Sequence, residues 1–382
     1  MRVLFVCGSY AQELDGVADY THRLSKRISG MGIECAVVSI NDKYTEKVMA
    51  SSRGCELGTE IEWLRIPAKT RLVKKRQYLR SELNRFQPDW ISLQYVPYSY
   101  NDKGVPLWLL YCLYSASSMA RWHWMTHELW VDPDACLRNR LIAPLQKLLL
   151  KSLSTILKPA VVQTSNEYYV DQLKSIGISA SILPLFSNIK VENQDYIGEQ
   201  AHSGLRLITF GSIHAEWRPE ILITKLKKLA QKHNLKPLTF VSIGHAGAYG
   251  ERIWQDLSRE NPEWLRFEKL GKLTASQVSL QLQRADFGIT TTPSHLLGKS
   301  GSVAAMLAHK LQVIVPRLDR VEGRWHKSLL YDDRFLLLDS LFEQRLLNSI
   351  SRKDSLRRNE RLYDDPLDRV SCLFLETILQ TT

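Results

Sequence analysis

Short apolar runs alternate along the chain with longer stretches in which apolar residues recur every three or four positions. The short runs have the length of buried β-strands, and the longer stretches have the period of amphipathic helices. In the first half, strands are predicted at 2–7, 34–40, 61–66, 90–96, 122–126 and 160–164. The helices between them are predicted at 16–31, 71–86, 105–120, 138–153 and 166–176. This alternation predicts parallel sheets with helices on both faces.

The alternation restarts after a polar segment at 186–205, which contains two glycines and has no hydrophobic period. The strands of the second half are predicted at 205–210, 238–243, 265–269, 287–291 and 312–315. Its helices are predicted at 220–233, 252–260, 275–284 and 303–309. Because the polar segment is typical of a linker, we predict two domains, at 1–190 and 200–364. A last amphipathic helix within 365–382 can dock on either of them.

The bulk composition narrows the class of protein. A chain of 382 residues, 44% apolar and 24% charged, fits two soluble globular domains. No apolar run reaches the roughly 18–20 residues that a membrane-spanning helix needs. The first predicted strand starts at Arg2, which leaves no room for a cleaved signal peptide, and the six cysteines show no metal-type spacing. We therefore expect a cytoplasmic protein with free thiols.

A net charge of +11 favours an acidic partner: nucleic acid, anionic lipid or a phosphorylated ligand. The positive charge is concentrated at 69–80, which has six cations and no acidic residue. Read as a helix, this segment places Leu72, Val73 and Leu79 in the core and its cations outside. A solvated helix face gives the same pattern. Nucleic-acid binding needs aromatic residues interleaved with the cations, and only Tyr78 is there, so no nucleic-acid partner is expected.

The segment 293–302 is a turn rich in Gly and Ser that precedes a predicted helix. Its last five residues are Gly298, Lys299, Ser300, Gly301 and Ser302. Backbone N–H groups at a helix start attract phosphate, and a lysine adds a full positive charge. The turn therefore predicts a diphosphate site, although a capped helix with a surface lysine fits equally well.

Polar residues also follow two strands of the first half. No G-x-G-x-x-G motif follows the first strand; a longer loop leads to Gly16, which opens a helix with Asp19 and His22 in its first turns. His127 ends an apolar strand, where ligands approach a parallel sheet, and Glu128 follows it. A histidine there can bind a sugar hydroxyl or move a proton. The alternatives are a flexible loop at Gly16 and a buried structural histidine.

The first strand of the second half ends at Gly211 and Ser212, and a helix is predicted to begin near Pro219. Arg218, directly before that helix, is well placed to bind a phosphate through its guanidinium group. A plain surface arginine is the alternative.

In order and spacing, these segments resemble the retaining enzymes of glycosyltransferase family 4, such as bacterial exopolysaccharide glucosyltransferases. The matching segments are GSYAQELDGVADYTHRL, MTHEL, LRLITFGSIHAEWRP and PSHLLGKSGSVAAMLAHKLQVIVP. The resemblance implies the GT-B fold, in which two doubly wound, Rossmann-like α/β domains face each other across a cleft. The first domain would lie on the acceptor side, and the second would bind the nucleotide-sugar donor.

The resemblance also implies a reaction. A hexose, expected to be glucose from UDP-glucose, would pass with retention to a saccharide or lipid-linked saccharide in cell-envelope or exopolysaccharide synthesis. His127 would contact the transferred sugar, and Gly16 would lie where donor and acceptor meet. Asp19, which can point into the cleft from the first turns of the same helix, is the third candidate catalytic residue. The residues implied for UDP binding are Gly211, Ser212, Arg218, Leu270, Gly271, Leu273, Lys299, Ser300, Gly301 and Ser302. No Asp-x-Asp motif lies in a suitable loop, so neither a metal nor another cofactor is expected.

The chain departs from the family pattern in two places. The family's two glutamates fall at Leu296 and Ala304, so the usual ribose contact is missing. The family's pair of cations falls at Ser212 and Arg218, and Lys299 is the expected replacement for the lost cation. One rival is a sugar-nucleotide epimerase of the same fold, which would need carboxylates that the segment 293–316 lacks. A nicotinamide-dependent oxidoreductase is disfavoured because its fingerprint is missing.

A further expectation concerns location. The predicted helices at 69–80 and 138–151 are rich in cations and can bind anionic lipid at the inner face of the cell membrane. The alternative is a soluble enzyme with solvated basic helices.

Overall fold

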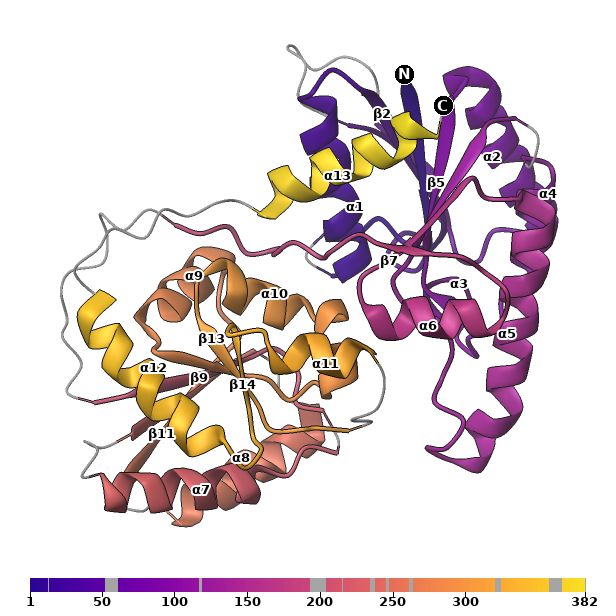
Figure 1. Cartoon of the computed structure of the whole chain (residues 1–382). Coiled ribbons are helices and arrows are strands. Elements are labelled where there is room, and N and C mark those ends of the chain that lie inside the picture. Colours follow the sequence, from indigo (N-terminus) through magenta and orange to yellow (C-terminus); the bar gives the residue numbers. More distant parts are fainter. Residues whose placement is uncertain are drawn as a thin grey trace. The chain divides into compact units, whose positions relative to one another are not determined.

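The computed structural model describes residues 1–12, 14–51, 61–116, 119–192, 204–214, 216–233, 238–244, 247–260, 264–319, 324–356 and 366–381. The chain forms two compact units. Unit 1 comprises Met1–Pro184 and Leu367–Thr382, and unit 2 comprises Leu185–Pro366 (Figure 1). Most of the predicted linker, at 193–203, lies outside the described residues.

The described part of unit 1 contains an eight-stranded sheet in the order β3-β4-β2-β1-β5-β6-β7-β8. Its strands are β1 (Arg2–Cys7), β2 (Glu34–Asp42), β3 (Met49–Ala50), β4 (Glu62–Pro67), β5 (Trp90–Tyr95), β6 (Arg121–Thr126), β7 (Val161–Thr164) and β8 (Ser181–Ile182). Neighbouring strands run parallel except for β3, which pairs antiparallel with β4 at the edge. The long parallel strands are buried on both faces, which explains their unbroken apolar runs.

The helices of unit 1 are α1 (Gly16–Ser29), α2 (Leu72–Phe86), α3 (Pro97–Tyr100), α4 (Trp108–Tyr114), α5 (Leu137–Leu157), α6 (Glu167–Ser175) and α13 (Pro366–Gln380). Figure 1 shows α1 and α13 on one face of the sheet, and α2, α4 and α5 on the other. The α13 helix is held on unit 1 by Phe374, whose ring stacks on Phe5 and meets His123 edge-on. An ion pair between Arg27 of α1 and Asp368 adds to this contact.

Two predictions for the helices of unit 1 were wrong in detail. The helix predicted at 105–120 is only α4, because Val105 precedes a proline, which disfavours the helical conformation at that residue. In α2, Leu79 is buried as predicted, but Leu72 and Val73 are exposed. Lys75 is buried instead; its Nζ donates a hydrogen bond to Asn41 Oδ1 (2.7 Å) and lies over the Trp108 ring. Residues 117–118 of the predicted helix lie outside the described residues.

The described part of unit 2 contains a six-stranded parallel sheet in the order β11-β10-β9-β12-β13-β14. The strands are β9 (Arg206–Phe210), β10 (Leu238–Ile243), β11 (Leu265–Gly271), β12 (Phe287–Ile289), β13 (Gln312–Val315) and β14 (Phe335–Leu337). The helices are α7 (Pro219–Lys232), α8 (Gly247–Glu260), α9 (Ala275–Arg284), α10 (Gly301–Ala308), α11 (Arg324–Leu330) and α12 (Phe342–Leu356). This strand order defines a doubly wound sheet and confirms the predicted fold class.

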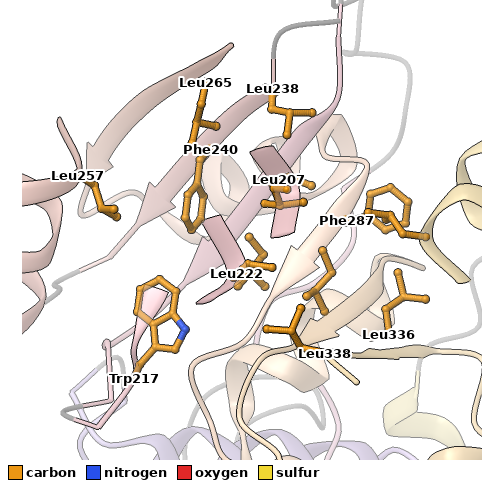
Figure 2. Packing of buried hydrophobic residues seen from close by; sticks show 14 of the residues in the cluster. Leu207, Trp217, Leu222, Leu238, Phe240, Leu257, Leu265, Phe287, Leu336 and Leu338 are labelled. Carbon is orange, nitrogen blue, oxygen red and sulfur yellow. The ribbon is translucent and has the colours of Figure 1, made fainter. Parts of the chain in front are cut away.

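The core of unit 2 lies on both faces of its sheet. Leu207 and Phe240 belong to one cluster with Trp217 and Leu222 of the α7 side (Figure 2). The next residues along the same strands, Ile208 and Val241, belong to a second cluster with α9 and α10. Successive strand residues point to opposite faces, so a strand covered on both sides is apolar throughout.

Among the described residues, no helix is long and apolar enough to cross a membrane.

Candidate active site

The carboxyl ends of β9, β10 and β11 carry three glycines, Gly211, Gly244 and Gly271, each with positive φ (95°, 104° and 66°). The Gly211 N–H donates to Ile243 O, and the Gly244 N–H donates to Gly271 O. A Cβ on Gly244 would lie 3.2 Å from Gly211 Cα. Glycine is required here because the loops leave the sheet in a conformation that other residues rarely adopt, with their backbones almost in contact.

The sheet of unit 2 reverses its strand order between β9 and β12, which is where doubly wound sheets bind ligands. The start of α10 lies at this point, since Ser302 Cβ is 3.6 Å from where a Cβ on Gly211 would be. Ser300 is the N-cap of α10, and its Oγ accepts a hydrogen bond from Val303 N. The Ser300 hydroxyl is also bonded to Ser302 Oγ (3.0 Å) and Thr292 Oγ1 (3.2 Å). The structure therefore brings Gly211 close to Ser300–Ser302, at a site that is rich in hydroxyl groups.

The predicted turn at 293–302 is more regular than expected. Residues Ser294–Lys299 form a 3-10 helix, and α10 begins directly after it at Gly301. Leu297 anchors this short helix in the core, and its carbonyl accepts a hydrogen bond from Ser300 N. Lys299 is thus held on a fixed backbone, one residue before the N-cap of α10.

A buried arginine that sequence reasoning missed lies on the same edge of the sheet. Arg317, which follows β13, is only 8% exposed. Its guanidinium group contacts His214 Nδ1 (2.6 Å) and forms ion pairs with Glu216 and Asp319. The backbone N–H of His214 donates a hydrogen bond to Oγ1 of Thr291, in the segment that follows β12. A cation two residues after an apolar strand was the available signal, because that position also lies at the ligand-binding edge.

Burial lowers the pKa of His214, and the positive charges of Arg317 and Lys299 lower it further, against the opposing effect of Glu216 and Asp319. His214 and Lys299 come from different loops on this edge of the sheet. This edge of unit 2 therefore carries two cations, a histidine with a lowered pKa and two carboxylates.

Arg218 occupies the N-cap position of α7, as predicted, but its side chain turns towards α8. Its described hydrogen bonds go to the Trp217 carbonyl and to the Tyr249 hydroxyl, and not to the start of α10. Ser212 is exposed, and its carbonyl accepts a hydrogen bond from Thr291 Oγ1. The structure thus places Arg218 in the expected loop without joining it to Lys299 or Ser300.

The turn after β11 holds the other predicted residues of unit 2. Gly271 ends that strand, and its carbonyl is already engaged by Gly244 N. Leu270 and Leu273 are partly buried and pack against the core cluster beneath α9 and α10. The side chains of Leu270 and Leu273 thus serve packing, which leaves their backbone groups as their means of contacting a ligand.

In unit 1, His127 follows β6 and is buried. Its Nε2 lies 2.9 Å from Gln94 Oε1, and its ring meets the Tyr20 ring edge-on. Because a carbonyl oxygen only accepts, Nε2 carries the proton in this arrangement. Burial, with a smaller effect from His123, lowers the pKa of His127 to about 3. At neutral pH this ring is therefore uncharged, so it is suited to hydrogen bonding and not to donating a proton as an imidazolium acid.

The α1 helix brings its predicted residues to the same end of the unit 1 sheet. Asp15 caps the helix, and nothing lies within 4 Å of a Cβ built on Gly16, at the first helical position. Asp19 is half-buried in the first turn. His22 Nδ1 is 2.8 Å from the Tyr10 hydroxyl, and burial lowers its pKa. Through Tyr20, α1 contacts His127, whereas Gly16 and Asp19 have no described contact with it.

The metal-binding potential of the described residues is limited. No group of three or more His, Cys, Asp or Glu side chains among them is arranged to hold a metal ion.

Sequence comparisons return no related protein. No protein-family model matches the chain. No curated protein matches it in sequence either.

Solved structures of sugar-nucleotide enzymes do match the fold. A putative UDP-N-acetylglucosamine 2-epimerase from Listeria monocytogenes matches with a TM-score of 0.57 at 10% identity, over 100% of this chain and 97% of that one. The lipopolysaccharide outer core galactosyltransferase WaaB matches with a TM-score of 0.56 at 15% identity, over 100% of both chains. A UDP-GlcNAc 2-epimerase from Neisseria meningitidis, bound to UDP-GlcNAc, matches with a TM-score of 0.53 at 10% identity, again over 100% of both chains.

The chain therefore has the GT-B fold, with two parallel-sheet α/β domains, which glycosyltransferases and 2-epimerases share. At these identities the likeness shows the fold alone.

Proposed function

We propose that this protein is a glycosyltransferase that binds a UDP-sugar at the carboxyl edge of the unit 2 sheet. The observation that supports this most is the convergence, at the switch point of that sheet, of the Gly211 loop, the hydroxyls of Ser300 and Ser302, and Lys299. Backbone N–H groups at the start of α10, together with a neighbouring cation, suit a diphosphate. Structural neighbours bind UDP or UDP-GlcNAc, which fits the same ligand class.

The chemistry follows from the charge that develops on the departing UDP. Lys299, Arg218 and the N–H groups of Ser300–Ser302 would stabilise that charge, and the turn of Leu270, Gly271 and Leu273 would contact the base through its backbone. Arg218 would have to leave Tyr249 to reach a phosphate, because its guanidinium group is held there in this structure. Arg317 is a second cation on this edge, although two carboxylates already pair with it.

The finer assignment rests on the resemblance to glycosyltransferase family 4. We propose glucose from UDP-glucose as the transferred sugar, retention at the anomeric carbon, and a saccharide or lipid-linked saccharide as the acceptor in cell-envelope or exopolysaccharide synthesis. The role proposed for His127 is a hydrogen bond to a sugar hydroxyl. Gly16 is proposed to lie where donor and acceptor meet, and Asp19 to be a catalytic residue on the same helix. Neither a metal nor another cofactor is part of the proposal, and the proposed location is the cytoplasm.

Sugar-nucleotide epimerisation is the second candidate. The segment 293–316 has no carboxylate, but the structure places Glu216 and Asp319 around Arg317 and beside His214, on the donor edge. Those groups are of the kind that acid–base chemistry on a bound sugar would need.

One experiment separates the candidates. The protein is incubated with UDP-glucose, UDP-galactose, UDP-GlcNAc and ADP-glucose, and products are followed for released nucleotide and for a new epimer. Release of UDP from UDP-glucose supports the transferase, whereas an epimer formed without net UDP release supports the epimerase. Calorimetry with UDP, NAD and an oligonucleotide tests the ligand class, and a chain that does not bind UDP refutes both candidates.

Single variants then test the site. A charge-assisted hydrogen bond contributes about 1.5–3 kcal/mol, so Lys299→Ala should weaken UDP binding about 10- to 100-fold. The matched control is Lys227→Ala, an exposed lysine of α7, which should leave UDP affinity unchanged. Unchanged UDP affinity in Lys299→Ala would remove that residue from the site.

Two other variants test the remaining roles. Arg218→Ala should lower both donor affinity and turnover. His127→Gln should lower turnover with little change in UDP affinity.

A further inference from the structure

The outer face of α5 carries four leucines that the fold leaves in solvent. Leu137, Leu141, Leu145 and Leu148 are 78%, 75%, 51% and 62% exposed. At about 100° per residue they lie within an arc of about 80°. The opposite side of α5 is apolar as well, but its leucines are buried in unit 1. The helix is therefore apolar on two sides, and packing within the described residues of unit 1 accounts for only one of them.

The neighbouring helix, α4, also exposes apolar side chains. Figure 1 shows α4 beside α5 on one face of the unit 1 sheet, and the two helices are in contact. Leu107, directly before α4, and Tyr111 and Tyr114 of α4 are 62%, 42% and 64% exposed. We call these three side chains and the four leucines of α5 the Leu/Tyr face. Large exposed apolar patches on a soluble domain mark interaction surfaces.

Positive charge borders the Leu/Tyr face. The α5 helix has four cations, Arg138, Arg140, Lys147 and Lys151, and no acidic residue. At about 100° per residue, Arg138 flanks the leucines on one side and the other three flank them on the opposite side. On the α2 side, Arg76 lies over the Tyr111 ring (4.7 Å). The nearest acidic residues in the sequence, Asp132 and Asp134, precede α5, and Glu82 of α2 is paired with Arg85.

We propose that the Leu/Tyr face docks unit 1 on an anionic membrane surface, with α5 lying parallel to it. The leucines would enter the boundary of the acyl chains while the long basic side chains reach the phosphate groups, as in other interfacial amphipathic helices. The positive charge around the Leu/Tyr face favours anionic lipid over a second copy of the chain. A second copy would bring its own cations against these, whereas anionic lipid complements them. The proposal does not depend on the reaction that the chain catalyses.

The test is co-sedimentation of the full chain with vesicles of phosphatidylcholine alone and of phosphatidylcholine mixed with phosphatidylglycerol. The wild type should bind the anionic vesicles, and about 1 M salt, which shortens the screening length to about 3 Å, should weaken that binding. Each cation near an anionic surface strengthens binding about fivefold, so reversing two in Arg140→Glu/Lys151→Glu should weaken it at least about 25-fold. Leu141→Ser/Leu148→Ser should weaken it at least about tenfold at both salt concentrations.

Matched controls come from α7 of unit 2. Lys227→Glu/Lys228→Glu makes the same change in net charge on another exposed basic helix, and Ile221→Ser removes an apolar side chain that is 60% exposed. Both should bind vesicles like the wild type, and circular dichroism should show every variant folded, because all of these side chains are exposed or partly exposed. Equal binding of the wild type to neutral and anionic vesicles would overturn the proposal, as would equal losses in the controls. So would a wild-type dimer that the leucine variant dissociates without any change in vesicle binding.

Discussion

Acidification should destabilise unit 1 through two buried histidines of β6 and its carboxyl end. His123 is bonded to Ser92 Oγ and Gln163 Oε1, and His127 is bonded to Gln94 Oε1. Burial lowers the pKa of His123 to about 4 and that of His127 to about 3. An unfolded histidine has a pKa of about 6.5. Between these values the unfolded chain binds protons that the folded chain does not, so stability is full near neutral pH and is lost as the pH falls.

The size of the effect follows from the same values. From pH 7 to pH 5 the unfolded state gains a free energy of protonation of about 2 kcal/mol for each histidine, while the folded rings stay neutral. The two together lower the free energy of unfolding of unit 1 by about 4 kcal/mol. That is a large part of the roughly 5–15 kcal/mol that stabilises a typical domain.

The decisive variant is His127→Gln, whose amide can still donate a hydrogen bond to Gln94 but does not titrate. The loss between pH 7 and pH 5 should shrink to about 2 kcal/mol. Because two units can unfold separately, the measurement is urea unfolding combined with hydrogen exchange of the β5 and β6 amides, which reports on unit 1. His233→Gln, at the end of α7 in unit 2, is the control and should retain the full loss. Parallel pH dependences of wild type and His127→Gln would refute the reasoning.

Two further substitutions test the packing. Phe374→Ala removes a fully buried ring that joins α13 to the sheet of unit 1, and urea unfolding should show a loss of about 3–5 kcal/mol; Leu379→Ala, on the same helix but 54% exposed, should stay within about 0.5 kcal/mol of the wild type. Gly244→Ala places a Cβ against the neighbouring strand end at a φ of +104°, so unit 2 should lose more than about 1 kcal/mol. Gly247→Ala also has positive φ but meets no atom within 4 Å, so a thermal unfolding midpoint as low as that of Gly244→Ala would show that crowding is not the cause.

The sequence predicted the main elements where an unbroken apolar run ends in polar residues. The bounds of β1, β10, β13 and α9 match the prediction residue for residue. The prediction missed β3, α3 and β8 in unit 1, and β14, α11 and α12 in unit 2. A three-residue strand such as β14 gives too short a pattern to be distinguished from a loop, and its pairing with β13 depends on the finished sheet.

The candidate site, too, could be predicted only in part from the sequence. Loops at strand ends could be chosen from the sequence, because the carboxyl edge of a parallel sheet is where ligands bind. The partners of each side chain could not, because they depend on the order of the strands. Gln94 meets His127 only because β5 pairs with β6, and Arg317 meets His214 only because β9, β12 and β13 lie side by side. The side chain of Arg218 lies towards Tyr249 and away from the start of α10. This direction depends on where α8 packs.

The contact between α13 and unit 1 has a consequence for how the chain is made. Phe5 leaves the ribosome before its stacking partner Phe374, and unit 2 is synthesised between them. Domains generally fold as units, and N-terminal ones fold first during synthesis, yet unit 1 has to wait for all of unit 2 before its sheet is covered by α13. A fragment cut at Pro184 would keep every described strand of unit 1 and still expose the apolar patch at Phe5 and His123. Unit 1 produced as a separate domain therefore has to include α13.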